Sequence, residues 1–275
     1  MKIAVAQLLS GVDPAANLAR IEEAVGAAAA GGAELVLFPE AMMRAFGSPD
    51  VPPTLVEVAE PTDGAWARAV QSIAERHGVV VVVGMFTPGA VGPSGNPRIR
   101  NTLLAVGAGV EAAYDKIHLY DAFDFAESES VEAGTEPVTF TAGGLTFGLA
   151  TCFDIRNPGL FQHYAKLGVD AILVAASWAG GHAKLLHWQT LITARALDAT
   201  CYVVACNQAD PRTAGVSTND GEPTGIGYSA IIAPDGVPVV VAESASETIV
   251  GEIDPAQTRA MRTRIPLLGA PVFSA

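Results

Sequence analysis

Short apolar runs alternate with longer amphipathic segments in the first third of the chain. The runs Ile3–Leu8, Leu35–Phe38 and Val79–Phe86 predict strands, and the second is wholly apolar, as expected for a strand buried on both faces of a sheet. The segments at about Pro14–Ala30 and Gly64–Arg76 predict helices, each of which ends at a glycine.

Further along the chain, the pattern of apolar runs also predicts β-hairpins. Three pairs of apolar runs are separated by glycine-containing turns: Leu103–Val106 with Val110–Tyr114, Val138–Phe140 with Leu145–Thr151, and Tyr228–Ile232 with Val237–Val241. Further strands are predicted at Ala171–Ala176 and Tyr202–Cys206, with helices at about Pro158–Leu167, Leu185–Asp198 and Pro255–Arg264. Crossovers place helices on sheet faces and hairpins add antiparallel strands, so the predicted class is α/β (α+β), with two mixed sheets packed together and flanking helices outside.

A single domain over residues 1–275 is the predicted organisation. Half of the residues are hydrophobic, which is enough for a large core. No Ser- or Pro-rich linker and no change of composition divides the chain, and one α/β domain commonly reaches this length.

Charge and cysteine content narrow the expected partners. The chain carries 29 acidic and 16 basic residues, a formal net charge of −13, and such a surface repels nucleic acid. Its three cysteines form neither a CxxC pair nor a disulfide framework. The first residues lack the pattern of a signal peptide, and no apolar stretch is long enough to span a bilayer. We therefore expect a cytoplasmic protein with no nucleic-acid or membrane partner.

Polar or reactive side chains follow five of the predicted strands. Ligands of open α/β sheets bind outside the carboxyl ends of the strands, so these positions indicate a site. The five positions are Pro39-Glu40, Asp115-Lys116, Cys152, Ser177-Trp178 and Asn207-Gln208.

Cys152 has two interpretations. A free cysteine is often only a small core residue, and this is the interpretation for Cys201 and Cys206, which lie within apolar runs. Cys152 instead lies at a strand end, before a predicted helix, in a pattern that resembles the elbow on which a nucleophile is exposed. A thiol nucleophile also needs a group that takes its proton.

Two other strand-end residues could activate this thiol. Glu40 follows a buried strand and a proline, an unusual place for an acid, although a surface carboxylate is the alternative. Lys116 could be an edge-strand lysine that discourages aggregation. A fixed cation would instead favour the thiolate and stabilise an oxyanion. None of the five histidines lies in a recognisable Cys-His signature.

Together these segments resemble the nitrilase superfamily of carbon–nitrogen hydrolases, whose members share a Glu–Lys–Cys triad. The resemblance runs from Met1 to about Ile265 and rests on motifs in the family's order. The matching segments are Leu37–Glu40, Tyr114–Asp121, Phe125–Ser128, Ala150–Arg156 and His187–Asp198.

The resemblance implies a four-layer α-β-β-α sandwich that assembles as a homodimer or higher homo-oligomer, and no metal or organic cofactor. It implies that Cys152 attacks the substrate and that Glu40 is the general base. Lys116 and the backbone N–H of Phe153 would hold the oxyanion, and Glu127 would position the reacting groups. Glu129 and Glu132 are rivals for the role of Glu127, because the loop that precedes them is short.

The implied function is hydrolysis of a small amide to ammonia and a carboxylic acid, as in ω-amidases or deaminated-glutathione amidases. Phe153-Asp154 favours this amidase branch over nitrilases proper, which tend to have Trp-Glu there. Asn157 and Gly159 depart from the pattern of amidase relatives, which usually carry an aromatic residue and a glutamate there.

Substrate-binding residues are expected in the loops Ala41–Pro53, Asp121–Glu132 and Ser177–Lys184. Ser177 and Trp178 are the expected contacts there. A substrate carboxylate would need a cation such as Arg156 or Arg44.

Three alternatives to an amidase stay open on the sequence. Two are enzymes, an N-carbamoyl amide hydrolase, which would release carbon dioxide as well as ammonia, and a nitrilase. The third is a catalytically silent member of the family that binds or scaffolds, although the intact Glu40, Lys116 and Cys152 argue against it.

Overall fold

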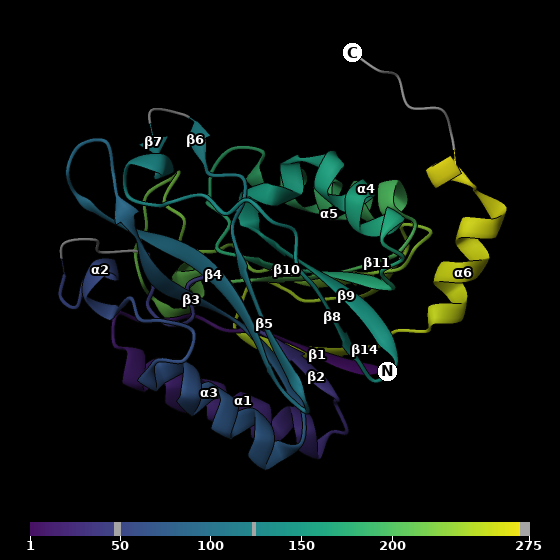
Figure 1. Ribbon diagram of the computed structural model, residues 1–275, viewed down its shortest axis with the longest axis horizontal. Helices are drawn as coiled ribbons and strands as arrows, with labels where there is room; N and C mark the ends of the chain where they lie inside the picture. Colours follow the sequence, from purple (N-terminus) through teal and green to yellow (C-terminus); the bar gives the residue numbers. More distant parts are fainter. Residues whose placement is uncertain (47–50, 123–124, 270–275) are drawn as a thin grey trace.

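Two six-stranded sheets form the centre of the protein (Figure 1). The computed structural model describes residues 1–46, 51–122 and 125–269. In order across the first sheet the strands are β14 (Glu247–Glu252), β1 (Lys2–Gln7), β2 (Leu35–Leu37), β3 (Val80–Val91), β4 (Pro97–Gly107) and β5 (Val110–Asp115). Across the second they are β13 (Pro238–Val241), β12 (Ala230–Ile232), β11 (Tyr202–Asn207), β10 (Ala171–Ala176), β9 (Leu145–Thr151) and β8 (Thr139–Ala142).

Each sheet has the same mixed pattern. The strands β1, β2 and β3 are parallel to one another, as are β9, β10 and β11, and all remaining pairs are antiparallel. Parallel strands need crossover helices, whereas the antiparallel strands at the sheet edges need only turns. The prediction of two mixed sheets is confirmed.

Helices cover the outer face of each sheet, which gives four layers (Figure 1). The helices α1 (Pro14–Ala30) and α3 (Ala65–His77) pack on the first sheet, and α4 (Pro158–Lys166) and α5 (Lys184–Ala199) pack on the second. The remaining helices, α2 (Leu55–Val58) and α6 (Pro255–Arg264), lie near the ends of the sheets. The α-β-β-α sandwich expected from the resemblance is therefore present.

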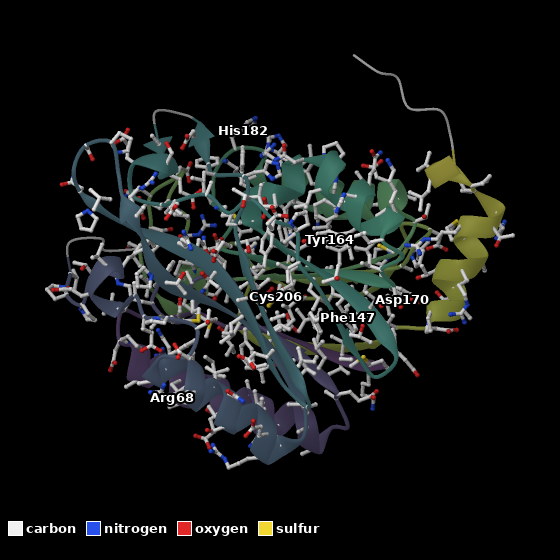
Figure 2. All side chains as sticks on the ribbon, viewed as in Figure 1. Arg68, Phe147, Tyr164, Asp170, His182 and Cys206 are labelled. Carbon is white, nitrogen blue, oxygen red and sulfur yellow. The ribbon has the colours of Figure 1, made fainter. Side chains whose placement is uncertain are left out.

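Successive side chains of a strand point to opposite faces of the sheet, and in the central strands both faces are covered, so these strands are largely apolar. In β1, Ile3 and Val5 face the second sheet, whereas Ala4 and Ala6 face the helices. Both faces are buried at these positions, which favours apolar side chains; the buried polar residue of the strand, Gln7, donates to the carbonyls of Glu243 and Ala245. Figure 2 shows Phe147 and Cys206 in the layer between the two sheets, and both belong to the cluster of side chains that fills it.

Short elements join these layers, and some of them lie close to the candidate site. The strands β6 (Asp121–Ala122) and β7 (Phe125–Ala126) form a two-stranded ribbon. Four 3₁₀ helices follow in the described residues, η1 (Glu127–Glu129), η2 (Cys152–Arg156), η3 (Pro211–Ala214) and η4 (Leu267–Gly269). Two of the four, η1 and η2, begin with a residue of the predicted site.

Apart from the short β6–β7 ribbon, which was not predicted, and shifts of one or two residues, the described structure differs from the predicted strands in three places. β14 is absent from the prediction because only Ile249 among its residues is buried, so it lacks a strong apolar pattern. β3 and β4 extend into one long hairpin through residues that are largely polar or exposed. The strand predicted at Tyr228–Ile232 begins only at Ala230, because Tyr228 has the left-handed φ of +57°.

Across the part of the chain that the structure describes, no helix combines the length and the apolar character that crossing a membrane requires.

Candidate active site

Glu40 stands in a tight turn just after β2. The N–H of Phe38 donates to the carbonyl of Val82 at 2.8 Å and keeps the chain against β3. Ala41 then has φ of +59°, which turns the chain sharply. A Cβ on Gly84 would lie 2.7 Å from the Ala41 nitrogen, so only glycine allows this approach. The turn buries the Glu40 carboxyl, which is 1% exposed.

Lys116 directly follows β5 and points its ammonium at two carboxylates. Its Nζ donates to both oxygens of Glu127 at 2.8 Å and lies 3.5 Å from Oε1 of Glu40. Its backbone N–H donates to the carbonyl of Asn101 at 2.9 Å, which fixes the segment against β4. The lysine is 2% exposed, so it is not an edge-strand lysine facing solvent.

Cys152 occupies an elbow between β9 and η2. Its φ of +47° is left-handed, a strained conformation for a residue with a Cβ that is common at active sites. The carboxylate of Asp154 holds the elbow, accepting from Thr151 N at 2.8 Å, from Tyr114 Oη at 2.7 Å and from His118 N at 2.9 Å. Asp154 thereby ties the segment that carries Lys116 to the segment that carries Cys152.

The thiol and the Glu40 carboxylate form a hydrogen-bonded pair. Burial raises the pKa of Glu40 and the charge of Glu127 adds to this, whereas Lys116 and the hydrogen bond from Asn101 act in the opposite direction. Burial also raises the pKa of Cys152 well above its ordinary value, and the Glu40 charge adds to the effect of burial. The resting pair is therefore a neutral thiol beside a carboxylate of increased basicity, a suitable arrangement for general base catalysis.

This electrostatic balance corrects one expectation about Lys116. The lysine does lower the pKa of Cys152, but burial and the two carboxylates outweigh it, so the resting thiolate is not favoured. Burial alone would lower the pKa of Lys116, yet Glu127 and Glu40 together raise it above its ordinary value. The ammonium therefore stays charged at neutral pH.

Of the three rival glutamates, Glu127 is the one that joins this cluster. It is 6% exposed, and its carboxylate contacts Lys116 Nζ and accepts from the N–H of Tyr120 at 2.6 Å. Glu129 is exposed on η1. Glu132 faces away and accepts from the N–H of Ala90 at 2.7 Å and from Arg100 Nε at 3.2 Å.

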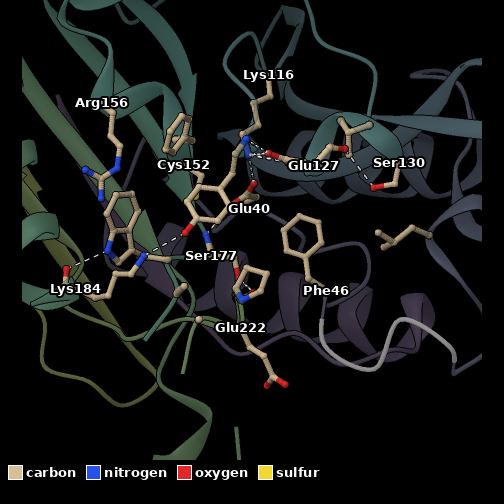
Figure 3. A pocket seen from close by; sticks show the side chains of 18 of the residues that line it. Glu40, Phe46, Lys116, Glu127, Ser130, Cys152, Arg156, Ser177, Lys184 and Glu222 are labelled. Atoms are coloured by element: carbon tan, nitrogen blue, oxygen red, sulfur yellow. Dashed lines mark hydrogen bonds and ion pairs between the residues drawn. The ribbon is translucent and has the colours of Figure 1, made fainter. Parts of the chain in front are cut away.

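A pocket of about 680 Å³ opens above the cluster. Figure 3 shows Glu40, Lys116, Glu127 and Cys152 converging at its floor. The upper walls are largely aromatic and aliphatic and also carry charged side chains of both signs. These wall residues include Phe46, Leu55, Tyr120, Val131, Phe153, Arg156, Trp178, Lys184, Asp220 and Glu222.

The predicted binding residues Arg156, Ser177 and Trp178 all line this pocket. The Arg156 guanidinium carbon lies 5.1 Å from the centroid of the Trp178 ring and 5.8 Å from that of Phe153. The Ser177 hydroxyl donates to the Pro223 carbonyl at 2.6 Å, and its N–H donates to Glu40 Oε2 at 2.7 Å. Ser177 therefore supports the floor and the loop above it with its own polar atoms.

Arg44 was wrong as a candidate for binding a substrate carboxylate. It is fully buried outside the pocket lining, and its guanidinium donates to the carbonyls of Pro53, Ala45 and Val51. It stabilises the loop that it belongs to. The predicted wall loops also include residues 47–50 and 123–124, which lie outside the described residues.

The structure adds pocket residues that the sequence pattern did not indicate. The loop Asn219–Pro223 forms one wall although it follows no predicted strand, and contacts with Ser177 and Gly180 hold it there. Asn101 lies under the pocket within a strand, so the search for polar residues after strand ends could not find it. Its place opposite Phe86 in the pairing of β3 with β4 could only come from the hairpin register.

Neither departure from the amidase pattern reaches the pocket. Asn157 ends η2, where its N–H donates to the Asp154 carbonyl at 2.9 Å, and Gly159 is exposed on α4. Both are outside the set of described residues that line the pocket. Within the described ranges, no group of three or more His, Cys, Asp or Glu side chains is arranged to hold a metal ion.

Comparison with known proteins points to one family. The sequence profile of the carbon–nitrogen hydrolase family matches residues 2–263. A hydrolase of Mycobacterium tuberculosis is 46% identical over 274 residues, 98% of this chain and 94% of the relative. The deaminated glutathione amidase of Escherichia coli O157:H7 is 34% identical, covering 78% of this chain and 76% of that enzyme. Nit3 of Saccharomyces cerevisiae, from branch 10 of the nitrilase superfamily, superposes with a TM-score of 0.80 at 27% identity, covering 97% of this chain and 94% of that chain.

Proposed function

The chain belongs to the carbon–nitrogen hydrolase family, and on that premise we propose that it hydrolyses a small linear amide through a thioester on Cys152. The observation that carries this proposal is the single buried contact network of Cys152, Glu40, Lys116 and Glu127 at the floor of the pocket. The network contains a nucleophile, a base bonded to it and a cation, which are the groups that acyl transfer requires.

Acylation begins when the Cys152 sulfur attacks the amide carbon and the thiol proton passes to Glu40. The tetrahedral intermediate then collapses, the carbon–nitrogen bond breaks, and Glu40 returns the proton to the leaving nitrogen. Ammonia departs and the acyl group stays on the sulfur as a thioester. The raised pKa of Glu40 suits both steps, because the carboxylate accepts a proton readily and its acid form is present long enough to donate it.

The oxyanion of the tetrahedral intermediate would be held by Lys116 and by the backbone N–H of Phe153. Phe153 is the second residue of η2, and the first N–H groups of a helix have no acceptor within that helix. Lys116 brings a permanent charge in a buried site, where its field is weakly screened.

Deacylation would follow the same path with water as the nucleophile. Glu40 takes a proton from water as its oxygen attacks the thioester carbon, and the carbon–sulfur bond breaks to release a carboxylic acid. The departing sulfur regains its proton from Glu40. Glu127, bonded to Lys116 through both oxygens, would hold the ammonium in place and help to position the leaving amine.

The substrate is proposed to be a small amide with a carboxylate at a distance from the amide group, as in ω-amides of dicarboxylic acids or deaminated glutathione. The relative from Escherichia coli is named a deaminated glutathione amidase. Arg156 is a candidate for the substrate carboxylate because it lines the pocket wall beside Cys152 and Trp178. Trp178 would pack against the carbon chain.

The wider organisation is proposed on separate observations. We propose one domain over residues 1–275, a cytoplasmic location and no nucleic-acid partner; the cysteines are all free thiols and the net charge is −13. We also propose a homodimer or higher oligomer through the outer helices. Leu186 and Leu197 are 64% and 45% exposed on one stripe of α5, which favours an interface there.

Ammonia release from a panel of ω-amides, neutral amides, nitriles and N-carbamoyl amino acids tests the proposal, with Cys152→Ala as the control. We expect hydrolysis of carboxylate-bearing amides, no turnover by Cys152→Ala, and an unchanged circular dichroism spectrum for that variant. Retained turnover in Cys152→Ala would overturn the mechanism. Carbon dioxide release would favour the carbamoyl alternative, and an ordinary Cys152 thiol without any turnover would favour a binding protein.

A further inference from the structure

Asn101 contacts two residues of the cluster at once. It lies in β4 and is 1% exposed. Its side-chain Nδ2 donates to Glu40 Oε1 at 2.6 Å, and its carbonyl accepts from the N–H of Lys116 at 2.9 Å. One residue of the sheet therefore fixes both the carboxylate and the segment that carries the cation.

Asn101 is the short side-chain donor to the Glu40 carboxylate. Lys116 Nζ is 3.5 Å from the same oxygen, because Glu127 holds the ammonium closer with two contacts of 2.8 Å. The other oxygen accepts at 2.7 Å from the backbone N–H of Ser177, which no side-chain substitution removes. The hydrogen bond from the Asn101 amide, in contrast, can be removed by a single side-chain substitution.

The same amide makes this hydrogen bond through its nitrogen, but its oxygen has no hydrogen-bond partner. Oδ1 of Asn101 is buried without a hydrogen-bond partner. A buried acceptor without a partner lowers stability, so a residue selected for stability alone would be apolar here. Local features that reduce stability in this way are expected at functional sites.

We propose that Asn101 is a positioning residue that fixes the rotamer of Glu40 and keeps it as a carboxylate beside the Cys152 thiol. The inference rests on the proposed role of Glu40 as general base. A hydrogen bond donated to a carboxylate stabilises its charged form relative to its acid form. The titratable groups that face Glu40 are Lys116, Glu127 and Cys152; Lys116 and the Cys152 thiol act in the same direction as Asn101, and Glu127 acts in the opposite direction.

The direct test is the pH dependence of Cys152 alkylation by iodoacetamide in Asn101→Leu. Leucine keeps a similar volume and removes both the donor and the unsatisfied acceptor. We expect the acid limb of the pH–rate profile for alkylation to shift to higher pH by about one unit. At a given pH on this limb, the reaction would then be about tenfold slower. We expect the midpoint of urea unfolding to stay unchanged or to rise. Peptide mass mapping separates Cys152 from the buried Cys201 and Cys206.

The alkylation rate is measured without hydrolysis of an amide, so it tests the role of Asn101 independently of the proposed substrate. If no amide is hydrolysed but the acid limb moves, the role of Asn101 holds and the substrate assignment fails. If amides are hydrolysed and the acid limb stays in place, the role of Asn101 is overturned.

Two controls distinguish positioning from a general effect on folding. Thr87→Val removes a buried side-chain contact on the neighbouring strand, the 2.9 Å bond to Thr102, and we expect it to leave the acid limb unchanged. In a Glu40→Gln background, Asn101→Leu should no longer change the alkylation profile, because its partner cannot ionise. A shift of equal size in that background would overturn the proposal.

Asn101→Asp serves as a second variant if Asn101→Leu does not fold. It has the same shape and places a second carboxyl group beside Glu40, which opposes ionisation of both. We expect its acid limb to move in the same direction and further. An unchanged acid limb in a folded Asn101→Asp protein would also overturn the proposal.

Discussion

Replacement of Lys116 by methionine tests the electrostatic balance of the buried cluster. Methionine keeps an unbranched apolar chain and removes the ammonium that contacts both Glu40 and Glu127. Both carboxyls are buried, so neither gains full hydration in exchange. The variant should therefore be less stable, by an amount that depends on pH.

The sign of that dependence follows from Glu40. Burial raises its pKa and Lys116 lowers it, so removal of Lys116 raises the folded-state pKa of Glu40 further above the unfolded value. The folded variant then binds more protons than its unfolded chain, and stability is lost as the pH rises from the unfolded pKa toward the folded one. One carboxyl contributes about 1.4 kcal/mol per pH unit over that window. Each pH unit by which the substitution raises this folded-state pKa adds about 1.4 kcal/mol to the loss at pH values above it, so a comparison at about pH 5 and about pH 7.5 tests the effect.

Urea unfolding at these two pH values measures the effect. The difference in unfolding free energy between wild type and Lys116→Met should be smaller at the acid pH and larger at the higher pH, by about 1.4 kcal/mol for each pH unit of the shift in the Glu40 pKa. Lys166→Met is the matched control, because this lysine is exposed on α4 and its loss should change little at either pH. An equal deficit for Lys116→Met at both pH values would refute the reasoning, since it would mean that methionine disturbs packing rather than charge.

Two further predictions concern the pocket and the turn that carries the base. Arg156→Gln should raise the KM for a carboxylate-bearing amide by about tenfold to a hundredfold and leave a neutral amide unaffected, because a charge-assisted hydrogen bond is lost; equal effects on both substrates, measured by ammonia release, would remove Arg156 from carboxylate binding. Gly84→Ala should cost about 1–3 kcal/mol of stability in urea unfolding and reduce kcat, because its Cβ would lie 2.7 Å from the Ala41 nitrogen and displace Glu40. Gly159→Ala is its control, since a Cβ there meets nothing within 4 Å, and a matching loss in both variants would contradict the close-approach argument.

Much of the fold was predictable because its strands are buried on both faces. Leu35–Leu37, Ala171–Ala176 and Tyr202–Asn207 are wholly buried, and each was recognisable as a continuous apolar run. β14 was not, because it is an edge strand with one buried side chain, and hydrophobic pattern reports burial rather than hydrogen bonding. The start of β12 was also missed, since Tyr228 has a left-handed φ of +57°, which the apolar pattern does not reveal.

The residues of the candidate site also divide into those that the sequence predicted and those that only the structure identified. Glu40, Lys116 and Cys152 could be found from the sequence because each comes at or just after the end of a predicted strand. Glu40 and Lys116 follow β2 and β5 of the first sheet and Cys152 follows β9 of the second, so their meeting depends on how the two sheets pack. The choice of Glu127 over Glu129 and Glu132 depends on which carboxylate reaches the Lys116 ammonium, and side-chain direction in a loop is not encoded by spacing alone.

The sequence by itself determined the layers, the strand ends and the residue types that can perform acyl transfer, because apolar periodicity and chain order are local properties. Only the tertiary structure decided the protonation balance of the thiol and its base, the place of Asn101 beneath Glu40, and the wall formed by Asn219–Pro223. These features arise from contacts between segments that are far apart in the chain. Burial and charge act through space, so their sum is fixed only when the segments have packed together.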